Sequence, residues 1–385
     1  VIFTIESMRA ADSPLPADLV QFWQQIEMVR LDEKTIQFRL PEAFAPFMDY
    51  LTFGVLPSHL LGDLTFSQMV DDPFNLQPVG SGPYRFDHLL VEGGQIAGIV
   101  LSAFKDYYGQ PAYIEQIAFR YYPDTAAAWA AYQAGEINGI GQVTPDLLPQ
   151  VLAETGLNTY SSRLPQLGML LLNLDNPQVA FLQDAGVRRA LLMAINRQRI
   201  IDSLLNGQAI LADGPIFPGT WAYYSGIERI AYDPEAATSL LRAAGYSIPA
   251  AGGRVRTAED GTRLSLELLY PDDPQHQAIA QAIQADWAGV GVEVTLIAAP
   301  YDTLVSERLD TRQYQAALVD LNLSRSPDPD PYPFWHQAQV SGGQNYANWD
   351  DRQASEYLEQ ARITTDLAER QRLYNNFQVR FSSEL

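Results

Sequence analysis

The stretch Gln315-Ala-Ala-Leu-Val-Asp-Leu-Asn-Leu-Ser-Arg-Ser-Pro-Asp-Pro-Asp-Pro-Tyr-Pro-Phe-Trp335 decides how the rest of the chain is read. Its first apolar run, from Ala316 to Val319, is typical of a buried strand. From Asp320 onward, small, polar and proline residues take over, and these cannot continue a central strand. A strand is therefore expected to end near Asp320, where a loop begins.

The sequence upstream of this strand alternates between strand and helix periodicity. The predicted elements are, in order, a strand over 264–268, a helix over 274–289, a strand over 292–296 and a helix over 302–310. A strand-helix-strand-helix-strand order favours a parallel sheet with right-handed crossovers. Ligands of such open sheets bind beyond the carboxyl ends of strands. The loop that begins at Asp320 is thus the first candidate binding surface, and an ordinary Asp-Pro surface turn is the alternative.

Composition excludes several classes of function. The length of 385 residues predicts two or three domains. No apolar run approaches the ~18 residues of a membrane span. The net charge of -21 argues against nucleic acid as a partner, because its phosphates would be repelled. Cysteine is absent, which excludes disulfides, thiolate nucleophiles and cysteine-based metal sites.

The first residues do not form a signal peptide. Val1-Ile2-Phe3-Thr4-Ile5 has neither a basic n-region nor a cleavage site. Residues 1–9 are predicted to be helical, so the sequence opens inside structure. We therefore expect it to be part of a longer chain.

Seven short motifs occur in series along the chain. They are Val1-Ile2-Phe3-Thr4-Ile5-Glu6, Gly80-Ser81-Gly82-Pro83-Tyr84, Ala134-Gly135-Glu136-Ile137, Val187–Arg197, Gly214–Gly219, Leu240–Tyr246 and Asp328-Pro329-Asp330-Pro331-Tyr332. In this order and spacing they resemble the bacterial extracellular solute-binding proteins of family five. Those proteins are the binding components of ABC importers for peptides, nickel and oligosaccharides. The resemblance covers almost the whole chain.

The sequence departs from the family pattern at both ends and at one internal position. Members of the family normally have a sizeable opening portion, with an export signal, before the position of Val1. They also have a final strand after the position of Leu385. The usual Asp before Arg197 is Asn196 here, a change that keeps the capping role. Part of one lobe and some ligand contacts are therefore expected to lie outside this sequence.

The resemblance implies an α/β fold with two lobes, that of the class II, peptide-binding type of periplasmic binding proteins, with mixed sheets and an interlobe cleft. Residues 1–79 would be a remnant of the small subdomain of lobe I, and 80–172 would be the rest of lobe I. Residues 173–385 would form lobe II, with the chain returning toward lobe I at its C-terminal end. The hinge is expected near 171–175.

The resemblance also implies the function. The chain would be an extracytoplasmic receptor that delivers a peptide-like or oligosaccharide ligand to the permease subunits of an ABC importer. It would be a monomer in the periplasm or at the outer face of the cytoplasmic membrane, and a lipid anchor through a missing N-terminal segment stays open. No enzymatic activity, cofactor or nucleic-acid partner is expected.

Two other classes of function stay open. One is a hydrolase that uses a pair of cleft carboxylates such as Asp320 and Asp328, although nothing in the sequence assigns one acid and one base. The other is a sensor or regulatory domain derived from the same fold. An export signal would support transport, and an attached DNA-binding segment would support regulation.

The candidate ligand-binding residues come from predicted loops. Large flat side chains in loops often contact a ligand, and a core position is the alternative for Trp221, Trp335 and Trp349. Trp129 and Trp287 lie in helical patterns and are predicted to be core residues. The full set of candidates is Asp320, Asn322, Ser324, Arg325, Trp221, Trp335, Tyr346 and Trp349.

Arg325 carries the one prediction about ligand chemistry. Peptide-binding members of the family place an Asp just before the Pro-Asp-Pro turn, where it pairs with the amino terminus of the peptide. Aligning that turn on Pro327-Asp328-Pro329 puts Arg325 in this position. A guanidinium would repel an ammonium group, so saccharides or ligands with acidic ends are expected to bind better than free peptides. If free peptides do bind, Asp320 is the alternative partner of the amine.

No metal site and no catalytic residue is predicted. The four histidines are scattered at 59, 88, 276 and 336, and none belongs to a metal-binding motif. Asp328 and Asp330 alternate with prolines and lack the glycine of an EF-hand loop. We expect them to be turn and helix-cap residues.

Overall fold

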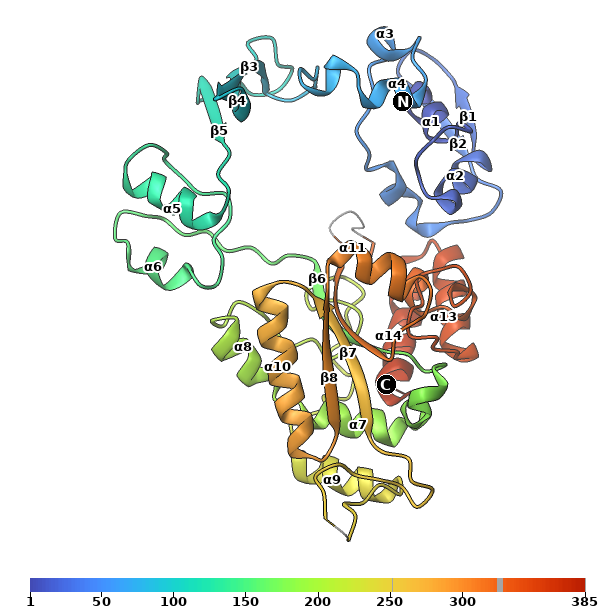
Figure 1. The fold of residues 1–385 in the computed structure, drawn as a ribbon. Helices are drawn as coiled ribbons and strands as arrows, with labels where there is room; N and C mark the ends of the chain where they lie inside the picture. The colour runs from blue at the N-terminus through green and yellow to red at the C-terminus, as the bar shows by residue number, and fades with distance from the viewer. Residues whose placement is uncertain (251, 324–327, 385) are drawn as a thin grey trace. The chain divides into compact units, whose positions relative to one another are not determined.

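The computed structural model describes residues 1–250, 252–323 and 328–384. The chain divides into two compact units (Figure 1). The first unit comprises Val1–Pro41 and Phe53–Tyr160, and the second comprises Glu42–Thr52 and Ser161–Leu385. The predicted lobe boundary at 172/173 and the hinge near it stay predictions.

The first unit contains two small antiparallel sheets and several short helices. One sheet pairs β1 with β2, and the other has the order β3-β4-β5. The strands are β1 (Glu27–Arg30), β2 (Ile36–Arg39), β3 (Tyr84–Glu92), β4 (Gln95–Ala103) and β5 (Gln116–Arg120). The helices are α1 (Ile2–Met8), α2 (Ala17–Gln24), α3 (Ser58–Leu61), α4 (Phe66–Val70), η2 (Pro73–Asn75), α5 (Thr125–Gln133) and α6 (Leu148–Ala153).

Two buried tryptophans of the first unit pack against other aromatic rings. Trp23 is buried and packs edge-on against Phe22 and Phe53. Trp129 is also buried, and its ring stacks on Tyr132 with centroids 5.4 Å apart. The prediction that Trp129 is a core residue is confirmed.

The second unit is built on a four-stranded sheet with the order β6-β9-β7-β8. Its strands are β6 (Gln166–Leu172), β7 (Ser265–Pro271), β8 (Glu293–Ala299) and β9 (Ala316–Asn322). β7 runs parallel to both β8 and β9, as the crossover pattern predicted, whereas β6 runs antiparallel to β9. The sheet is therefore mixed, and the predicted parallel core of three strands is confirmed.

Helices surround this sheet. They are η1 (Ala45–Leu51), η3 (Pro177–Gln183), α7 (Ala185–Ala194), α8 (Arg197–Leu204), α9 (Pro234–Ala243), α10 (Pro274–Gly289), α11 (Tyr301–Thr303), η4 (Leu304–Leu309), α12 (Tyr332–Trp335), η5 (Gln337–Gln339), α13 (Arg352–Ile363) and α14 (Leu367–Glu384). The predicted helix over 302–310 is α11 continued by η4, a π-helical turn. No helix in the described parts of the chain has the length and apolarity to cross a membrane.

Acidic and amide caps start most of the longer helices. A side-chain oxygen at the N-cap accepts a backbone N–H at the start of α7, α8, α9, α10 and α13. At α8 this cap is Asn196, whose Oδ1 accepts from the backbone nitrogen of Arg199 at 3.0 Å. The capping role predicted for Asn196 is therefore confirmed.

The two faces of the sheet carry separate apolar cores, because successive strand residues point to opposite faces. Leu318 of β9 belongs to one core and Val319 to the other. The first core is covered by α7, α9 and α10, and the second by α13 and α14 (Figure 1). β9 is thus apolar on both sides up to Val319 and can carry a charge only beyond it.

Trp287 joins α10 to α7 within the first core. Its side chain is 1% exposed, and its indole N–H donates to the carbonyl oxygen of Leu191 at 2.9 Å. This position confirms the prediction that Trp287 is a core residue.

Replacing Trp287 should test this core. Trp287→Ala removes a large buried side chain and should lower the free energy of unfolding by about 3–5 kcal/mol. Trp287→Phe keeps a ring but loses the hydrogen bond, so it should cost less, about 1–3 kcal/mol. Urea unfolding followed by circular dichroism measures both. Tyr113→Ala, at a 98% exposed position, is the control. An alanine variant as stable as the unmodified protein would contradict the assignment.

Candidate functional site

The carboxyl ends of β7, β8 and β9 lie at one edge of the sheet, as parallel strands require. Asp272 follows β7, Asp302 follows β8 by a few residues, and Asp320 lies near the end of β9. Asp272 and Asp302 are exposed. The edge predicted from the sequence to hold a ligand is therefore strongly acidic.

At this edge, Asp320 contacts residues from three other elements of the second unit. Its Oδ2 accepts from the amide nitrogen of Gln166 on β6 at 2.7 Å and lies 3.2 Å from Nε2 of His276 on α10. Its backbone oxygen accepts from the hydroxyl of Tyr301 on α11 at 3.2 Å. The Asp320 side chain is 24% exposed, so a ligand from solvent can reach it.

His276 connects Asp320 to the start of α10. Its Nδ1 lies 2.6 Å from Oδ2 of Asp273, and the Oδ1 of Asp273 accepts the backbone N–H groups of Gln275 and His276, each at 3.0 Å. The Asp320 carboxylate raises the pKa of His276, against the effect of burial and together with Asp273. In return, the imidazole lowers the pKa of Asp320. Both shifts favour the charged forms, the imidazolium and the carboxylate, which attract each other.

The second carboxylate oxygen of Asp320, Oδ1, has surroundings that differ from those of Oδ2. Among the described residues, no donor is recorded within hydrogen-bond distance of Oδ1. Gly168 of β6 pairs with Asp320 across the sheet, and a Cβ added to this glycine would lie 3.2 Å from Oδ1. The glycine thus keeps this oxygen uncrowded. A half-buried carboxylate with one unbound oxygen is suited to accept a charged donor such as an ammonium group.

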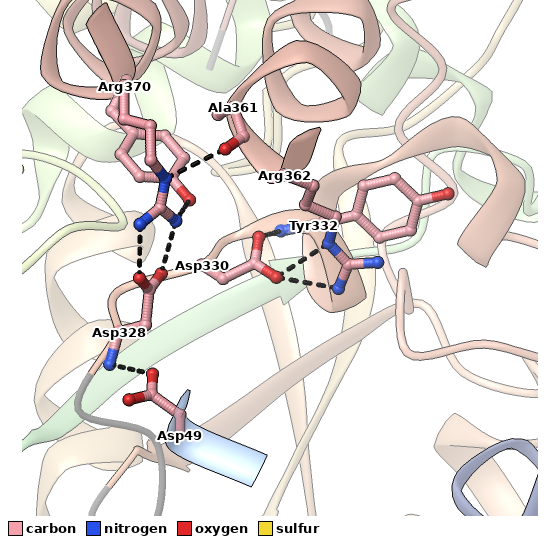
Figure 2. Close-up of polar contacts among 8 residues, drawn as sticks. Asp49, Asp328, Asp330, Tyr332, Ala361, Arg362 and Arg370 are labelled. Atoms are coloured by element: carbon pink, nitrogen blue, oxygen red, sulfur yellow. Dashed lines mark hydrogen bonds and ion pairs between the residues drawn. The ribbon is translucent and has the colours of Figure 1, made fainter. Parts of the chain in front are cut away.

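The carboxylates of the Asp-Pro turn have a different environment (Figure 2). Arg370 of α14 donates to both oxygens of Asp328, at 2.7 and 3.0 Å. Its remaining N–H groups reach the carbonyl oxygen of Ala361 at 2.9 Å and the hydroxyl of Tyr374 at 3.0 Å. Arg370 is 5% exposed, and although burial lowers its pKa, the bonds to Asp328 raise it above the ordinary value.

Asp330 is held in a similar way by Arg362 of α13. Two nitrogens of Arg362 lie 2.8 Å from Oδ2 of Asp330, while Oδ1 accepts from the backbone nitrogen of Tyr332 at 3.1 Å. The guanidinium also lies 3.7 Å from the centre of the Tyr332 ring, which adds a cation–π contact. Asp330 is therefore a turn residue, as predicted, but it is not a helix cap, because the N-cap of α12 is Pro331 and no side chain caps that helix.

Asp49 of η1 closes this cluster from a distant part of the sequence. Its Oδ2 accepts from the backbone nitrogen of Asp328 at 2.5 Å (Figure 2). Burial raises the pKa of Asp49, although the Asp328 N–H opposes that effect. We name Asp49, Asp328, Asp330, Arg362 and Arg370 the turn cluster. Because Arg370 occupies both oxygens of Asp328, the cluster gives no support to a hydrolase with Asp328 as acid or base.

Two of the predicted ligand-binding aromatics lie in the core instead. Trp335 and Trp349 are each 8% exposed, and their rings lie 4.7 and 5.4 Å from that of Phe381 on α14. Their loop positions suggested access to a ligand, but α14 packs over them. This burial corrects the prediction that they line a binding surface.

The other predicted residues are distributed between the edge and the second core. Trp221 is partly buried, with Arg370 5.0 Å from its ring centre. The hydroxyl of Tyr346 donates to Asp310 at 3.0 Å, and burial raises the pKa of Tyr346 to about 12. Asn322 is the exposed last residue of β9. Ser324 and Arg325 lie outside the described residues, so the predictions for them stay untested.

Sequence reasoning missed the partners of Asp320. In the sequence, His276 is one of four scattered histidines, and no motif points to Gln166 or Tyr301. A usable signal was present, since Asp273-Pro274 is a helix start that directly follows a predicted strand. A histidine in the first turn of such a helix lies at the ligand edge of the sheet. Within the described residues, no group of side chains is arranged to hold a metal ion.

A polar pocket of about 430 Å³ lies at the other end of the sheet, where Gln315 precedes β9. Asn173, which lines it, donates to the carbonyl oxygens of Arg312 and Tyr314, each at 2.9 Å, and accepts from Asn348 at 2.7 Å. These amides hold the surrounding loops together. We therefore place the candidate ligand site at the Asp320 edge.

Comparison with known proteins identifies the family. Residues 1–345 match the family model described as bacterial extracellular solute-binding proteins, family 5 Middle. The chain belongs to this family. The α/β fold with mixed sheets that the sequence motifs predicted is confirmed as a family 5 solute-binding fold.

Individual relatives agree with this assignment. The dipeptide-binding protein of Escherichia coli is 26% identical over 92% of this chain, which spans 63% of that protein's length. Among solved structures, the oligopeptide-binding protein AppA from Bacillus subtilis, in complex with a nonapeptide, has a TM-score of 0.74 at 23% identity, covering 100% of this chain and 75% of that one. The substrate-binding protein CtaP from Listeria monocytogenes has a TM-score of 0.82 at 23% identity, covering 100% and 74%.

The buried ion pair of the turn cluster generates a stability prediction. Arg370→Ala leaves the Asp328 carboxylate buried without its partner, so it should lower the free energy of unfolding by about 3–5 kcal/mol. The double variant Arg370→Met/Asp328→Leu removes both charges and should lose much less than the two single changes combined. Thermal and urea unfolding measure these differences. Arg372→Ala is the matched control on α14, because Arg372 is exposed, and it should change stability little. Equal effects of Arg370→Ala and Arg372→Ala would contradict the buried role.

Proposed function

We propose that this chain is the ligand-binding part of an extracytoplasmic receptor that delivers peptides to an ABC importer. The single observation that carries the proposal is the Asp320 carboxylate. It lies at the carboxyl ends of parallel strands and is held by Gln166 and His276, and no described residue donates a hydrogen bond to its Oδ1. The free amino terminus of a peptide is an ammonium group that fits such an oxygen.

The comparisons support the same ligand class. The E. coli relative is a dipeptide-binding protein, and the AppA structure contains a nonapeptide. The acidic edge formed with Asp272 and Asp302 attracts a cationic group and disfavours a ligand with acidic ends. An oligosaccharide ligand, the other option from the sequence, has no comparable support. The Arg325 hypothesis, which favoured such ligands, concerns a residue outside the described ranges.

The remaining parts of the proposal follow from family membership. We propose that the receptor acts outside the cytoplasm, as a monomer, and that permease subunits of an importer are its partners. We propose no catalytic step. A sensor derived from the same fold would bind the same peptides, so only an interaction with permease subunits separates that alternative.

Calorimetric titration with trialanine and N-acetyl-trialanine tests the proposal. We expect the free peptide to bind and the acetylated peptide, which lacks the ammonium group, to bind much more weakly. Asp320→Asn should remove a charge-assisted hydrogen bond of about 1.5–3 kcal/mol, which corresponds to roughly a 10- to 150-fold loss of affinity. Gly168→Ala should also weaken binding, because its Cβ crowds Oδ1.

Glu293→Gln provides the control for this titration. Glu293 starts β8 at the opposite edge of the sheet and pairs with Arg263, so its neutralisation changes the net charge equally without touching the site. Equal binding of both peptides, or an unchanged affinity in Asp320→Asn, would refute the assignment of the amine to Asp320. Tight binding of maltotriose without any binding of peptide would favour the oligosaccharide alternative.

A further inference from the structure

His276 lies between two carboxylates. Its Nδ1 is 2.6 Å from Oδ2 of Asp273, and its Nε2 is 3.2 Å from Oδ2 of Asp320. The imidazole is 12% exposed, so water screens these contacts only in part. Both nitrogens of one ring therefore face anionic acceptors.

A neutral imidazole cannot satisfy this arrangement. It has one N–H, so its second nitrogen would present a lone pair to a carboxylate oxygen. The imidazolium form donates from both nitrogens and matches both acceptors. The geometry at the end of β9 is thus that of a protonated His276, and the pKa of His276 is raised accordingly, chiefly by Asp320.

Among the described residues, the groups around the ring do not supply a competing positive charge. β6 contributes the neutral amide of Gln166, and α11 contributes Tyr301, whose pKa is raised by burial, so that its hydroxyl stays neutral. α8 pairs Arg199 with Asp286 near the opposite end of α10, at 2.7 Å. In the described part of the chain, no lysine or arginine forms an ion pair with Asp273 or Asp320. Within those residues, His276 is therefore the cation that pairs with Asp320.

We infer that His276 positions Asp320 and that its proton competes with the ammonium group of a ligand for this carboxylate, so that binding releases a proton. This inference rests on the proposed function. The imidazolium holds Oδ2 and leaves Oδ1 to the ligand, which fixes the direction of the bound amine. Once the amine is bound, two cations share one carboxylate and repel each other. The imidazolium is then the group that can lose its charge.

The direction of the pH dependence follows from linkage. Ligand binding opposes protonation of His276, so it lowers the pKa of His276, and by reciprocity deprotonation of His276 strengthens binding. Affinity for an ammonium ligand should therefore rise as pH rises through the titration of His276. If one proton is released, the change is at most about tenfold per pH unit.

Titration of the full chain with trialanine between pH 5 and pH 8 tests this inference. His276→Gln is the informative variant, because an amide can still donate to a carboxylate but has no proton to release. At each pH, the affinity of the unmodified protein is divided by that of the variant. This ratio is independent of the titration of the peptide's own amine, which affects both affinities equally. We expect this ratio to rise several-fold with pH. Calorimetry in two buffers of different ionisation enthalpy should show more proton release by the unmodified protein than by His276→Gln, in which the remaining contribution is proton uptake by the neutral fraction of the peptide's amine.

A second measurement does not depend on any ligand. NMR of selectively labelled imidazole groups should give His276 a pKa above the ordinary value, and Asp320→Asn should lower it. A flat affinity ratio and no difference in proton release would overturn the inference while leaving the proposed function intact. If trialanine fails to bind, the proposed function fails. In that case, an imidazole pKa unchanged by Asp320→Asn would also overturn the pairing itself.

Discussion

Burial of β9 on both faces is the constraint on which the second unit depends. Leu318 and Val319 belong to different cores, so a charged side chain anywhere between Ala316 and Val319 would be desolvated without a partner. The first charge appears at Asp320, where the residues of β9 are no longer fully buried. Burial on both faces excludes charged residues from β9 up to Val319. The first carboxylate of the strand therefore lies at the edge where parallel-sheet proteins bind ligands.

The carboxylates beyond this point are neutralised in two different ways. Asp328 is bound through both oxygens by Arg370, a group that stays charged at any physiological pH. Asp320 is paired through one oxygen with His276, whose charge can change. The first arrangement is suited to permanent structure, since it leaves nothing to exchange. The second leaves one oxygen without a donor from the described residues and includes a proton that can be lost, as our proposal of reversible cation binding requires.

Local patterns predicted the elements well, because strand alternation and helix caps depend on neighbouring residues. Trp287 was recognised as a core residue from its helical spacing, and Asn196 from its position between two helices. Trp335 and Trp349 were misjudged because their burial depends on Phe381, a residue of a later helix that no local pattern connects to them. The pairing of His276 with Asp320 depends likewise on strand register, which places α10 beside the end of β9. Contacts between segments that are far apart in the sequence cannot be predicted from local patterns in a single sequence.

The segment Glu42–Thr52 belongs to the second unit, although the first unit surrounds it in sequence. During synthesis, Asp49 leaves the ribosome long before Asp328 and Arg370 exist. Until then its carboxylate has only water as a partner, and the loop between the two contact points is very long. Such distant contacts form late in folding, because the entropy of closing the loop must be overcome first. The second unit is therefore not synthesised as one continuous stretch of the chain. A gene fragment starting after residue 160 would encode its sheet and most of its helices, but not the residue that accepts the Asp328 amide.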